Sequence, residues 1–366
     1  MSNRLIIIGA STRAAAQSSI IAGFEPYCID MFADRDLRAT CEALRVPAGQ
    51  YPHGLAAMVR DAPDGPLVFT GAMENHIDVL DRIMAAGRRL PGCSPATVRC
   101  VRQPQLWTRL PVITGVRPCR TGHEGVRTTR CLIKPLRSAG GGRVRFLNSG
   151  DTVTTHEYAQ EYVEGVPISV CYVGRERSAA LCGVTEQIIG DPAFGASGFR
   201  YVGNIWPAQV SADQVSAMSR LGDALADRYD LRGPFGVDAV INQGGDVRPV
   251  ELNPRYTAGM ELIERGRHVS VFVPDIDLKP KASNVYHGKS IVFARHDMIV
   301  GDLYEEFDPS QVADVPALGE PIEAGQPICT VFATGRNRDD VLACLRDRAA
   351  TLYTRTAHGP LQRSAT

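Results

Sequence analysis

At the start of the chain, short β-branched apolar runs alternate with polar loops and helical stretches, which is the pattern of an open α/β unit. Strands are expected at residues 4–8, 26–30 and 67–70, with an Ala-rich helix after the first and another helix after the third. The breaker cluster Pro-Gly-Cys-Ser-Pro at 91–95 ends this pattern and predicts a domain boundary. Residues 1–95 are therefore expected to form one domain.

Polar residues follow two of these strands. Ser11 and Arg13 come directly after the first, and Glu74 and Asn75 come shortly after the third. Open α/β sheets bind ligands beyond the carboxyl ends of their strands, so all four residues are candidates for binding a substrate. The alternative is structural: Ser11 as a helix cap with Arg13 in solvent, and Glu74 and Asn75 as ordinary residues of a first helical turn.

A second clear pattern lies further along the chain, where apolar runs at 235–241 and 247–252 flank the sequence Asn-Gln-Gly-Gly-Asp. The middle of this segment has the composition of a turn, so the segment is predicted to be a β-hairpin. Alternation along a strand gives Glu251 and Asn253 the same face, and pairing across the turn brings Asp238 opposite them.

Oxygen ligands of this kind suit Mg²⁺, which prefers one or two carboxylates together with phosphate oxygens and water. Asp238, Glu251 and Asn253 are therefore the predicted metal ligands. Arg255 follows at the next position on the same face, where a guanidinium could meet a phosphoryl or acyl oxyanion. The alternative is a surface hairpin that carries ordinary charges.

A third pattern joins an apolar strand to a glycine loop. Residues 131–135 (Cys-Leu-Ile-Lys-Pro) form the strand and carry Lys134, and Gly140, Gly141 and Gly142 follow. Glycines leave the backbone N–H groups free to close over phosphates. The lysine precedes the glycines, so this is not a Walker loop.

The remainder of the chain alternates between strand and turn patterns. The glycine- and aromatic-rich loop at 190–207 is long enough to be functional, and its Arg200 and Asn204 are candidates for an acceptor site. A strand at 285–294 and turn-rich β structure at 315–328 precede a final helix.

Composition narrows the class of protein. The chain has 366 residues, of which 44% are hydrophobic and 22% charged, as in globular proteins. The formal net charge is zero, which gives no electrostatic support to a nucleic-acid or membrane partner. Ten scattered cysteines without a CxxC pair suggest free thiols in a reducing compartment, so a cytoplasmic location is expected.

The pattern G-V-D…V-E-x-N-x-R in the hairpin, with the strand lysine and glycine loop before it, resembles the ATP-grasp superfamily. The resemblance implies that Asp238, Glu251 and Asn253 bind the metal and that Arg255 lies beside an acyl phosphate. It also implies that Lys134 binds phosphate and that the loop of Gly140, Gly141 and Gly142 covers the nucleotide.

Residues 158–169 are similar to the hinge at which this family binds adenine, with Gln160, Glu161 and Val163 at the adenine positions. Two departures from the family pattern leave contacts open. Pro167 stands near the usual position of a ribose-binding glutamate. The helix near residue 100 carries Arg99, Arg102 and Gln103 but no lysine to reach the α-phosphate.

The resemblance also implies the fold class. An N-terminal open α/β (pre-ATP-grasp) domain is expected to precede a two-part ATP-grasp fold at 96–280, with its hinge near 160–165. A small C-terminal β-rich domain is expected at 281–354 and a mobile tail at 355–366.

The activity implied is that of an ATP-dependent ligase, which activates a carboxylate as an acyl phosphate and joins it to an amine. The cofactors are ATP and Mg²⁺, with Mn²⁺ as an alternative metal. The partners are small-molecule acid and amine substrates, and the resemblance allows a homodimer. Two alternatives stay open: a carboxylase that uses bicarbonate, and a nucleotide-binding regulator without turnover.

Overall fold

The computed structural model describes residues 3–122, 130–273 and 283–356. The expected boundary at 280/281 and most of the expected tail, from residue 357 onward, lie outside the described residues. The domain boundaries predicted from the sequence therefore stay a prediction.

The N-terminal elements form a parallel four-stranded sheet with the strand order β3-β2-β1-β4. Alternating strands and helices fold in this way because each crossover helix buries its apolar face on the sheet. The strands are β1 (Arg4–Gly9), β2 (Glu25–Asp30), β3 (Glu42–Arg45) and β4 (Leu67–Phe69). The helices are α1 (Arg13–Ile21), α2 (Arg35–Thr40), α3 (Leu55–Asp61) and α4 (Ile77–Ala85).

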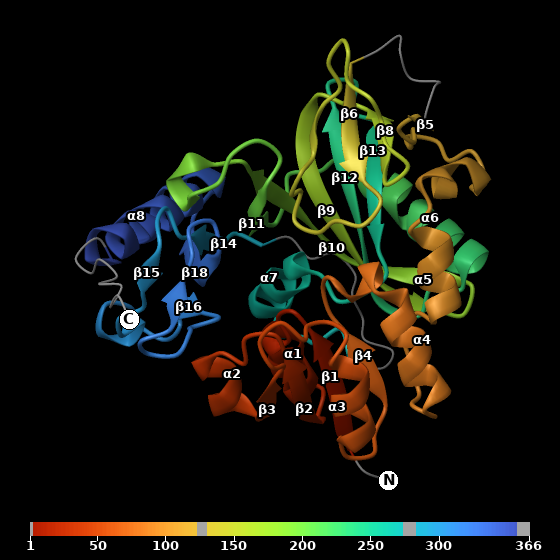
Figure 1. Ribbon diagram of the computed structural model, residues 1–366. Coiled ribbons are helices and arrows are strands. Elements are labelled where there is room, and N and C mark those ends of the chain that lie inside the picture. Colours follow the sequence, from red (N-terminus) through yellow and green to blue (C-terminus); the bar gives the residue numbers. More distant parts are fainter. Residues whose placement is uncertain (1–2, 123–129, 274–282, 357–366) are drawn as a thin grey trace.

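The neighbouring strands β1 and β4 end at the same edge of this sheet. Backbone hydrogen bonds tie the loop after β4 to this edge, from Thr70 N to Ile8 O in β1 and from Ala10 N, in the loop after β1, to Gly71 O, both at 2.9 Å. The short 3₁₀ helix η1 (Met73–Asn75) then carries the chain away from this edge. The loop after β4 thus projects from the sheet toward the middle of the molecule (Figure 1).

A small antiparallel sheet and a large one form the middle of the chain. The small sheet has the order β5-β8-β6-β7. Its strands are β5 (Thr121–Gly122), β6 (Cys131–Pro135), β7 (Arg145–Phe146) and β8 (Glu157–Glu161). Before it come helix α5 (Pro95–Val101) and the 3₁₀ helix η2 (Pro104–Arg109).

The large sheet has eight strands in the order β13-β12-β9-β10-β11-β14-β18-β16. The strands from the middle of the chain are β9 (Gly165–Arg175), β10 (Ser178–Ile189), β11 (Tyr201–Trp206), β12 (Gly233–Asn242) and β13 (Val247–Asn253). Helices α6 (Ala212–Tyr229) and α7 (Ala258–Arg267) pack on it, and the 3₁₀ helix η3 (Pro192–Phe194) precedes β11. The predicted hairpin is present as β12 and β13, with Asp238 opposite Glu251.

The C-terminal strands continue this same sheet, because β14 pairs with β11. They are β14 (Tyr286–Phe293), β16 (Val312–Ala313) and β18 (Pro327–Gly335), while β15 (Met298–Ile299) and β17 (Pro321–Ile322) form a separate pair. The 3₁₀ helix η4 (Leu303–Glu305) and the last helix, α8 (Arg338–Thr356), complete this region. The predicted mixed α/β fold class is confirmed, but the C-terminal β structure shares its sheet with the strands before it.

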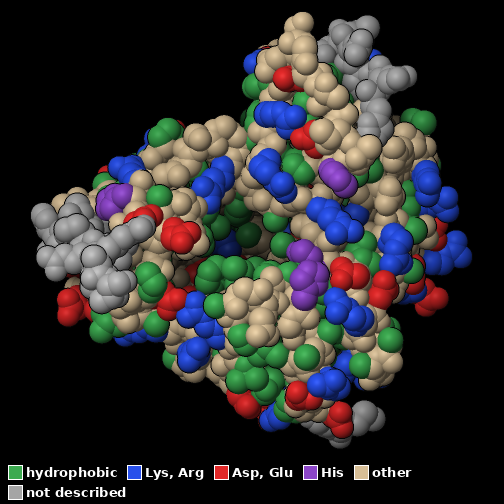
Figure 2. Space-filling view, in the orientation of Figure 1, with side chains coloured by type: hydrophobic (Ala, Val, Ile, Leu, Met, Phe, Trp, Pro, Cys, Tyr) green, Lys and Arg blue, Asp and Glu red, His purple; other side chains and the backbone are tan. Residues whose placement is uncertain are grey.

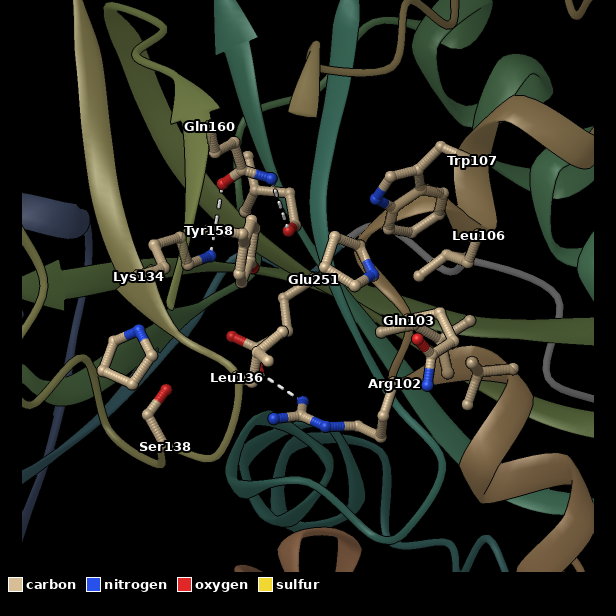
Figure 3. A pocket seen from close by; sticks show the side chains of 15 residues that line it. Arg102, Gln103, Leu106, Trp107, Lys134, Leu136, Ser138, Tyr158, Gln160 and Glu251 are labelled. Carbon is tan, nitrogen blue, oxygen red and sulfur yellow. Dashed lines mark hydrogen bonds and ion pairs between the residues drawn. The ribbon is translucent and has the colours of Figure 1, made fainter. Parts of the chain in front are cut away.

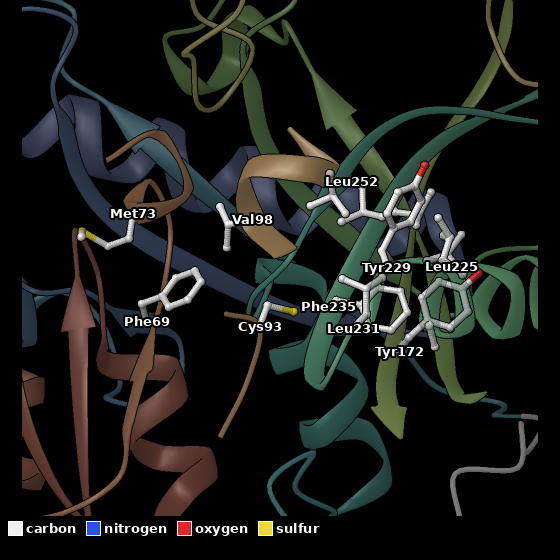
Figure 4. Close-up of a cluster of buried hydrophobic side chains, with 14 of the residues drawn as sticks. Phe69, Met73, Cys93, Val98, Tyr172, Leu225, Tyr229, Leu231, Phe235 and Leu252 are labelled. Atoms are coloured by element: carbon white, nitrogen blue, oxygen red, sulfur yellow. The ribbon is translucent and has the colours of Figure 1, made fainter. Parts of the chain in front are cut away.

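One hydrophobic core joins the N-terminal sheet to the large sheet. It runs from Phe69 and Met73 through Val98 to Tyr172 and Phe235, and the last two rings stack with centroids 4.9 Å apart (Figure 4). Burial of this apolar surface stabilises the contact between the two units by roughly 25 cal/mol per Å². The loop after β4 therefore has a fixed position relative to the hairpin.

A buried cluster of charges joins the same N-terminal unit to the C-terminal strands. Arg13 is 3% exposed and donates to Glu261 at 2.5 Å and to Asp314 at 2.8 Å, and Asp36 lies 3.5 Å away. Lys289 also pairs with Glu261, at 2.7 Å. Burial opposes ionisation of Glu261, yet Arg13 and Lys289 outweigh it and hold the pKa of Glu261 well below its usual value.

This cluster corrects the role that the sequence suggested for two residues. The guanidinium of Arg13 is enclosed by carboxylates of the protein itself, so it serves to join structural units. Ser11 is exposed and donates to Asp314 at 3.4 Å. The loop after β1 faces the C-terminal strands, which local sequence patterns do not reveal.

Replacing Arg13 tests this structural role. Arg13→Gln leaves Glu261 and Asp314 without their shared counter-ion, and breaking a buried ion pair in this way costs about 3–5 kcal/mol. We expect urea unfolding to show a loss of that size. Arg60→Gln is the matched control, because Arg60 and its partner Asp61 are both exposed and the change should stay within about 0.5 kcal/mol. Equal stabilities of the two variants would contradict the account.

Candidate active site

A cavity of about 390 Å³ lies between the small sheet, the large sheet and the loop after β4. Figure 2 shows a hollow where these parts of the molecule meet, with Lys and Arg side chains around its opening. Residues predicted from five separate sequence patterns line it. They are Glu74 from the N-terminal unit, Lys134, Gly140 and Gly141 from the strand and glycine loop, Gln160, Glu161 and Val163 from the hinge, Asn204 from β11, and Asp238, Glu251, Asn253 and Arg255 from the hairpin.

The hairpin brings the three predicted metal ligands together. Asp238 and Glu251 are register partners, and the Asn253 amide donates to Asp238 Oδ2 at 3.0 Å. Gln187 on β10 donates to the other oxygen of Asp238 at 2.9 Å. Burial, together with repulsion from Glu251, raises the pKa of Asp238 to about 6.

These residues fit a divalent cation. Two partly buried carboxylates repel each other here, and a cation held by both would relieve that repulsion. In the part of the chain that the structure describes, no three His, Cys, Asp or Glu residues form a metal-binding group. The protein thus offers two carboxylates and an amide rather than a complete cage, as suits Mg²⁺ when phosphate oxygens and water supply the other ligands.

An arginine that the sequence analysis left without a role pairs with this hairpin. Arg102, at the end of α5, donates to Glu251 at 2.6 Å (Figure 3). It also donates to Asn75 Oδ1, at 3.1 Å. The Asn75 amide donates in turn to the backbone oxygen of Ser138, at 3.0 Å, just before the glycine loop. Burial would raise the pKa of Glu251, but Arg102 and Lys134 outweigh it and lower that pKa. One indication of this role is present in the sequence: Arg102 lies at the end of the helix in which ATP-grasp proteins carry a phosphate-binding lysine.

Lys134, on β6, lines the cavity. It is 9% exposed, and its Nζ donates to Gln160 Oε1 at 3.2 Å (Figure 3). The Gln160 amide donates to the backbone oxygen of Val250 on the hairpin at 3.0 Å. The Gln160 side chain therefore connects the lysine strand to the hairpin, while the chain after it forms the hinge.

The hinge residues Glu161 and Val163 both line the cavity. Glu161 accepts from Arg248 at 3.0 Å and from the Arg120 backbone N–H at 3.2 Å. Burial works against its ionisation, but these donors prevail and lower the pKa of Glu161. Its side chain is thus fixed to the protein, and the hinge backbone is left for recognition of a ligand.

The glycine loop packs against the loop before β11. Gly141 has a φ of +69°, and a Cβ atom there would lie 1.9 Å from the backbone oxygen of Phe199. Gly140 has a φ of +62° with open space around it, and its backbone oxygen accepts from Tyr201 N at 3.0 Å. Gly140 and Gly141 line the cavity, whereas Gly142 is not among its lining residues.

Arg255 is held by the loop after β4. Its Nε and Nη2 donate to one oxygen of Glu74, Oε1, at 2.9 and 2.8 Å, and its Nη2 also reaches Asn253 Oδ1 at 3.2 Å. Gly71 packs flat on the guanidinium, since a Cβ there would lie 3.2 Å from Arg255 Cζ. The N-terminal unit thereby sets the position of an arginine on the hairpin.

Two candidates from the 190–207 loop differ in their placement. Asn204 lines the cavity, accepts from the Tyr201 hydroxyl and donates to Thr185 at 2.8 Å. Arg200 lies outside it, because its guanidinium stacks on the Phe293 ring at 3.6 Å and donates to Gly325 O at 2.6 Å. Like Ser11 and Arg13, Arg200 is therefore not among the residues that line the cavity.

Residues 114–259 match the ATP-grasp domain family. An uncharacterized protein of Methanocaldococcus jannaschii is 22% identical over 360 residues, covering 90% of this chain and 88% of the relative.

Solved structures share the fold. L-amino acid ligase from Bacillus licheniformis superposes with a TM-score of 0.67 at 13% identity, over 94% of this chain and 96% of that one. The biotin carboxylase domain of 2-oxoglutarate carboxylase from Hydrogenobacter thermophilus, solved with MgADP and bicarbonate, superposes with a TM-score of 0.68 at 12% identity. The match covers 95% of this chain and 89% of that one. N5-carboxyaminoimidazole ribonucleotide synthetase from Thermotoga maritima superposes with a TM-score of 0.65 at 13% identity, over 96% of this chain and 98% of that one.

These findings confirm the predicted resemblance: residues 114–259 match the ATP-grasp domain family, and the fold is similar to those of the ligase, carboxylase and synthetase structures named above. Among the described residues, no helix has both the length and the apolar character needed to cross a membrane.

The contact between Gly141 and Phe199 yields a test of the glycine loop. Gly141→Ala and Gly140→Ala both place a side chain at positive φ, which costs each about 1 kcal/mol. Only the first also collides with the Phe199 backbone. We expect Gly141→Ala to weaken binding of a non-hydrolysable ATP analogue with Mg²⁺ about tenfold more than Gly140→Ala, by isothermal titration calorimetry. Equal affinities of the two variants would show that the loop does not depend on this contact.

Proposed function

We propose that the protein is an ATP-dependent ligase that activates a substrate carboxylate as an acyl phosphate and joins it to an amine. The observation that carries this proposal is the shared cavity of Lys134, the hairpin oxygens and Arg255. Lys134 can bind phosphate, the hairpin oxygens can bind a metal ion, and Arg255 can bind an oxyanion. All of them line the same cavity. The ATP-grasp domain at 114–259 supports the nucleotide part of the proposal.

The nucleotide would occupy the side of the cavity formed by the glycine loop and the hinge. Lys134 supplies a charge-assisted contact to phosphate, and the backbone near Glu161 and Val163 meets the base. Asp238, Glu251 and Asn253 would hold Mg²⁺, which neutralises phosphate charge when bound. Arg102 stands beside Glu251 and adds a second fixed cation close to that site.

The chemistry proceeds in two displacements. An oxygen of the substrate carboxylate forms a bond to the γ-phosphorus of ATP, and the bond to the β-phosphate oxygen breaks, so ADP leaves with the bonding electrons. The amine nitrogen then bonds to the acyl carbon, and phosphate leaves with the electrons of the C–O bond. Of the two protons that the ammonium form loses, one ends on phosphate and one in solvent.

The protein residues act by positioning and by electrostatics. Phosphoryl transfer of this kind needs no strong protein nucleophile. Arg255 stabilises negative charge on the acyl phosphate, and its orientation is fixed by Glu74 and Gly71. Closure of the loop at Gly140 and Gly141 excludes water, which would otherwise hydrolyse the intermediate.

Trapping the intermediate tests the proposal. Wild-type protein is incubated with MgATP, hydroxylamine and a panel of carboxylic acids, because hydroxylamine converts an acyl phosphate to a coloured hydroxamate. We expect hydroxamate and ADP to form in equal amounts with at least one acid. ADP formation that depends on bicarbonate alone would favour the carboxylase alternative, and no turnover with any acid would favour a non-catalytic regulator.

Removing one hairpin charge gives a sharper prediction. Glu251→Gln keeps the side-chain shape but removes a predicted metal ligand, and should lower the rate of hydroxamate formation at least about tenfold. Asp246→Asn is the matched control, since Asp246 lies in the turn of the same hairpin, pairs with Arg117 at 3.1 Å and does not line the cavity. If both variants keep the wild-type rate, the hairpin is not the metal site.

A further inference from the structure

One carboxylate oxygen at the cavity has no partner among the described residues. Glu74 is 2% exposed, and both hydrogen bonds from Arg255 go to its Oε1. Its other oxygen, Oε2, is buried without any hydrogen bond. A buried acceptor without a donor costs about 1–3 kcal/mol, and more when it is charged. Such an atom in the wall of a cavity calls for a ligand that supplies the missing donor.

The surroundings of Glu74 fix this oxygen in place. Arg255 holds the first oxygen, Gly71 packs on the guanidinium, and the hydrophobic core holds Met73. The next residue, Asn75, is already bonded to Arg102 and to the Ser138 backbone. Oε2 thus has no hydrogen-bond partner among the described residues, and it belongs to a side chain that lines the cavity.

The charge of Glu74 selects the kind of ligand. A carboxylate paired with a guanidinium accepts hydrogen bonds and donates none, so it disfavours an anion at Oε2. An ammonium group brings three donors and a positive charge, and charge-assisted hydrogen bonds are roughly twice as strong as neutral ones. Bicarbonate, an anion, has no comparable reason to approach this oxygen.

We propose that Glu74 Oε2 binds the ammonium group of the amine substrate, an inference that rests on the proposed ligase function. Glu74 then has two separate tasks, one for each oxygen. Oε1 orients Arg255 toward the acyl phosphate, and Oε2 places the amine nitrogen beside it. The reacting acyl carbon and its nucleophile are thus brought together by one side chain of the N-terminal unit.

The substitution Glu74→Gln separates the two tasks. Glutamine keeps a carbonyl oxygen for Arg255 but puts an NH₂ donor at the second position, where it repels an ammonium group. Hydroxylamine is mostly uncharged at neutral pH and does not need the ammonium contact. Glu74→Gln also removes the counter-charge of Arg255, so hydroxamate formation should slow. The KM for the amine should rise about thirtyfold, which is more than the hydroxamate rate falls, because only the amine also loses its contact with Oε2. The amine is found by screening the twenty L-amino acids and ethanolamine for ADP formation with the trapped acid.

Each outcome decides. An unchanged amine KM in Glu74→Gln, with hydroxamate still formed, overturns the amine subsite but leaves the ligase proposal standing. Loss of both activities in parallel also overturns it, because Glu74 would then act only through Arg255. If the wild-type protein forms no hydroxamate with any acid, the proposed ligase function itself is contradicted. Glu186→Gln is the matched control, since Glu186 pairs with Arg338 at 2.8 Å outside the cavity.

A second measurement on the wild-type protein does not depend on the folding of the variant. The alcohol that carries a hydroxyl in place of the ammonium of the active amine should inhibit with a constant at least about tenfold above the KM of the amine. An alcohol that binds as tightly as the amine would exclude a charge-selective contact at Glu74.

Discussion

The site depends on guanidinium–carboxylate pairs that cross from the N-terminal half to the hairpin. Arg255 meets Glu74 across 181 residues of chain, and Arg102 meets Glu251 across 149. The Glu74 side chain is 1% exposed and the Glu251 side chain 30%, so removal of either arginine leaves a poorly solvated carboxylate without its counter-ion. These pairs, rather than local chain geometry, place the loop after β4 against the predicted metal ligands.

The charged residues around the cavity also shift the pKa values of the two hairpin carboxylates in opposite directions. Arg102 and Lys134 lower the pKa of Glu251, whereas burial and the charge of Glu251 raise that of Asp238. A cation at the hairpin would share Glu251 with Arg102 and separate the two carboxylates electrostatically. Arg102 and Asn75 connect Glu251 to the backbone before the glycine loop, so a metal bound at Glu251 would act on that loop through these hydrogen bonds.

Local features of the site could be predicted from the sequence. The turn composition at Asn242–Asp246 and the alternation of side chains brought Asp238, Glu251 and Asn253 to one place, because strand periodicity fixes which residues share a face. The order of strand lysine and glycines similarly identified Lys134 and the loop at Gly140 and Gly141. These signals lie within short segments, where residue spacing translates directly into geometry.

Long-range pairings could not be predicted in this way. Arg13 and Asp314 are 301 residues apart, and nothing near either position indicates that each is the other's counter-ion. The same holds for Arg102 and for the pairing of β14 with β11, which extends the large sheet into the C-terminal region. Such contacts follow from how the units pack, and a single sequence carries no periodic signal for that packing.

The proposed function requires that a substrate carboxylate is activated by transfer of the γ-phosphoryl group of ATP. The most direct measurement uses the acid found by trapping, labelled with ¹⁸O in its carboxylate, and analyses the released phosphate by mass spectrometry. The account predicts that one carboxylate oxygen appears in inorganic phosphate for each amide formed, with ADP as the other product. Phosphate without ¹⁸O, or release of AMP and pyrophosphate, would contradict it.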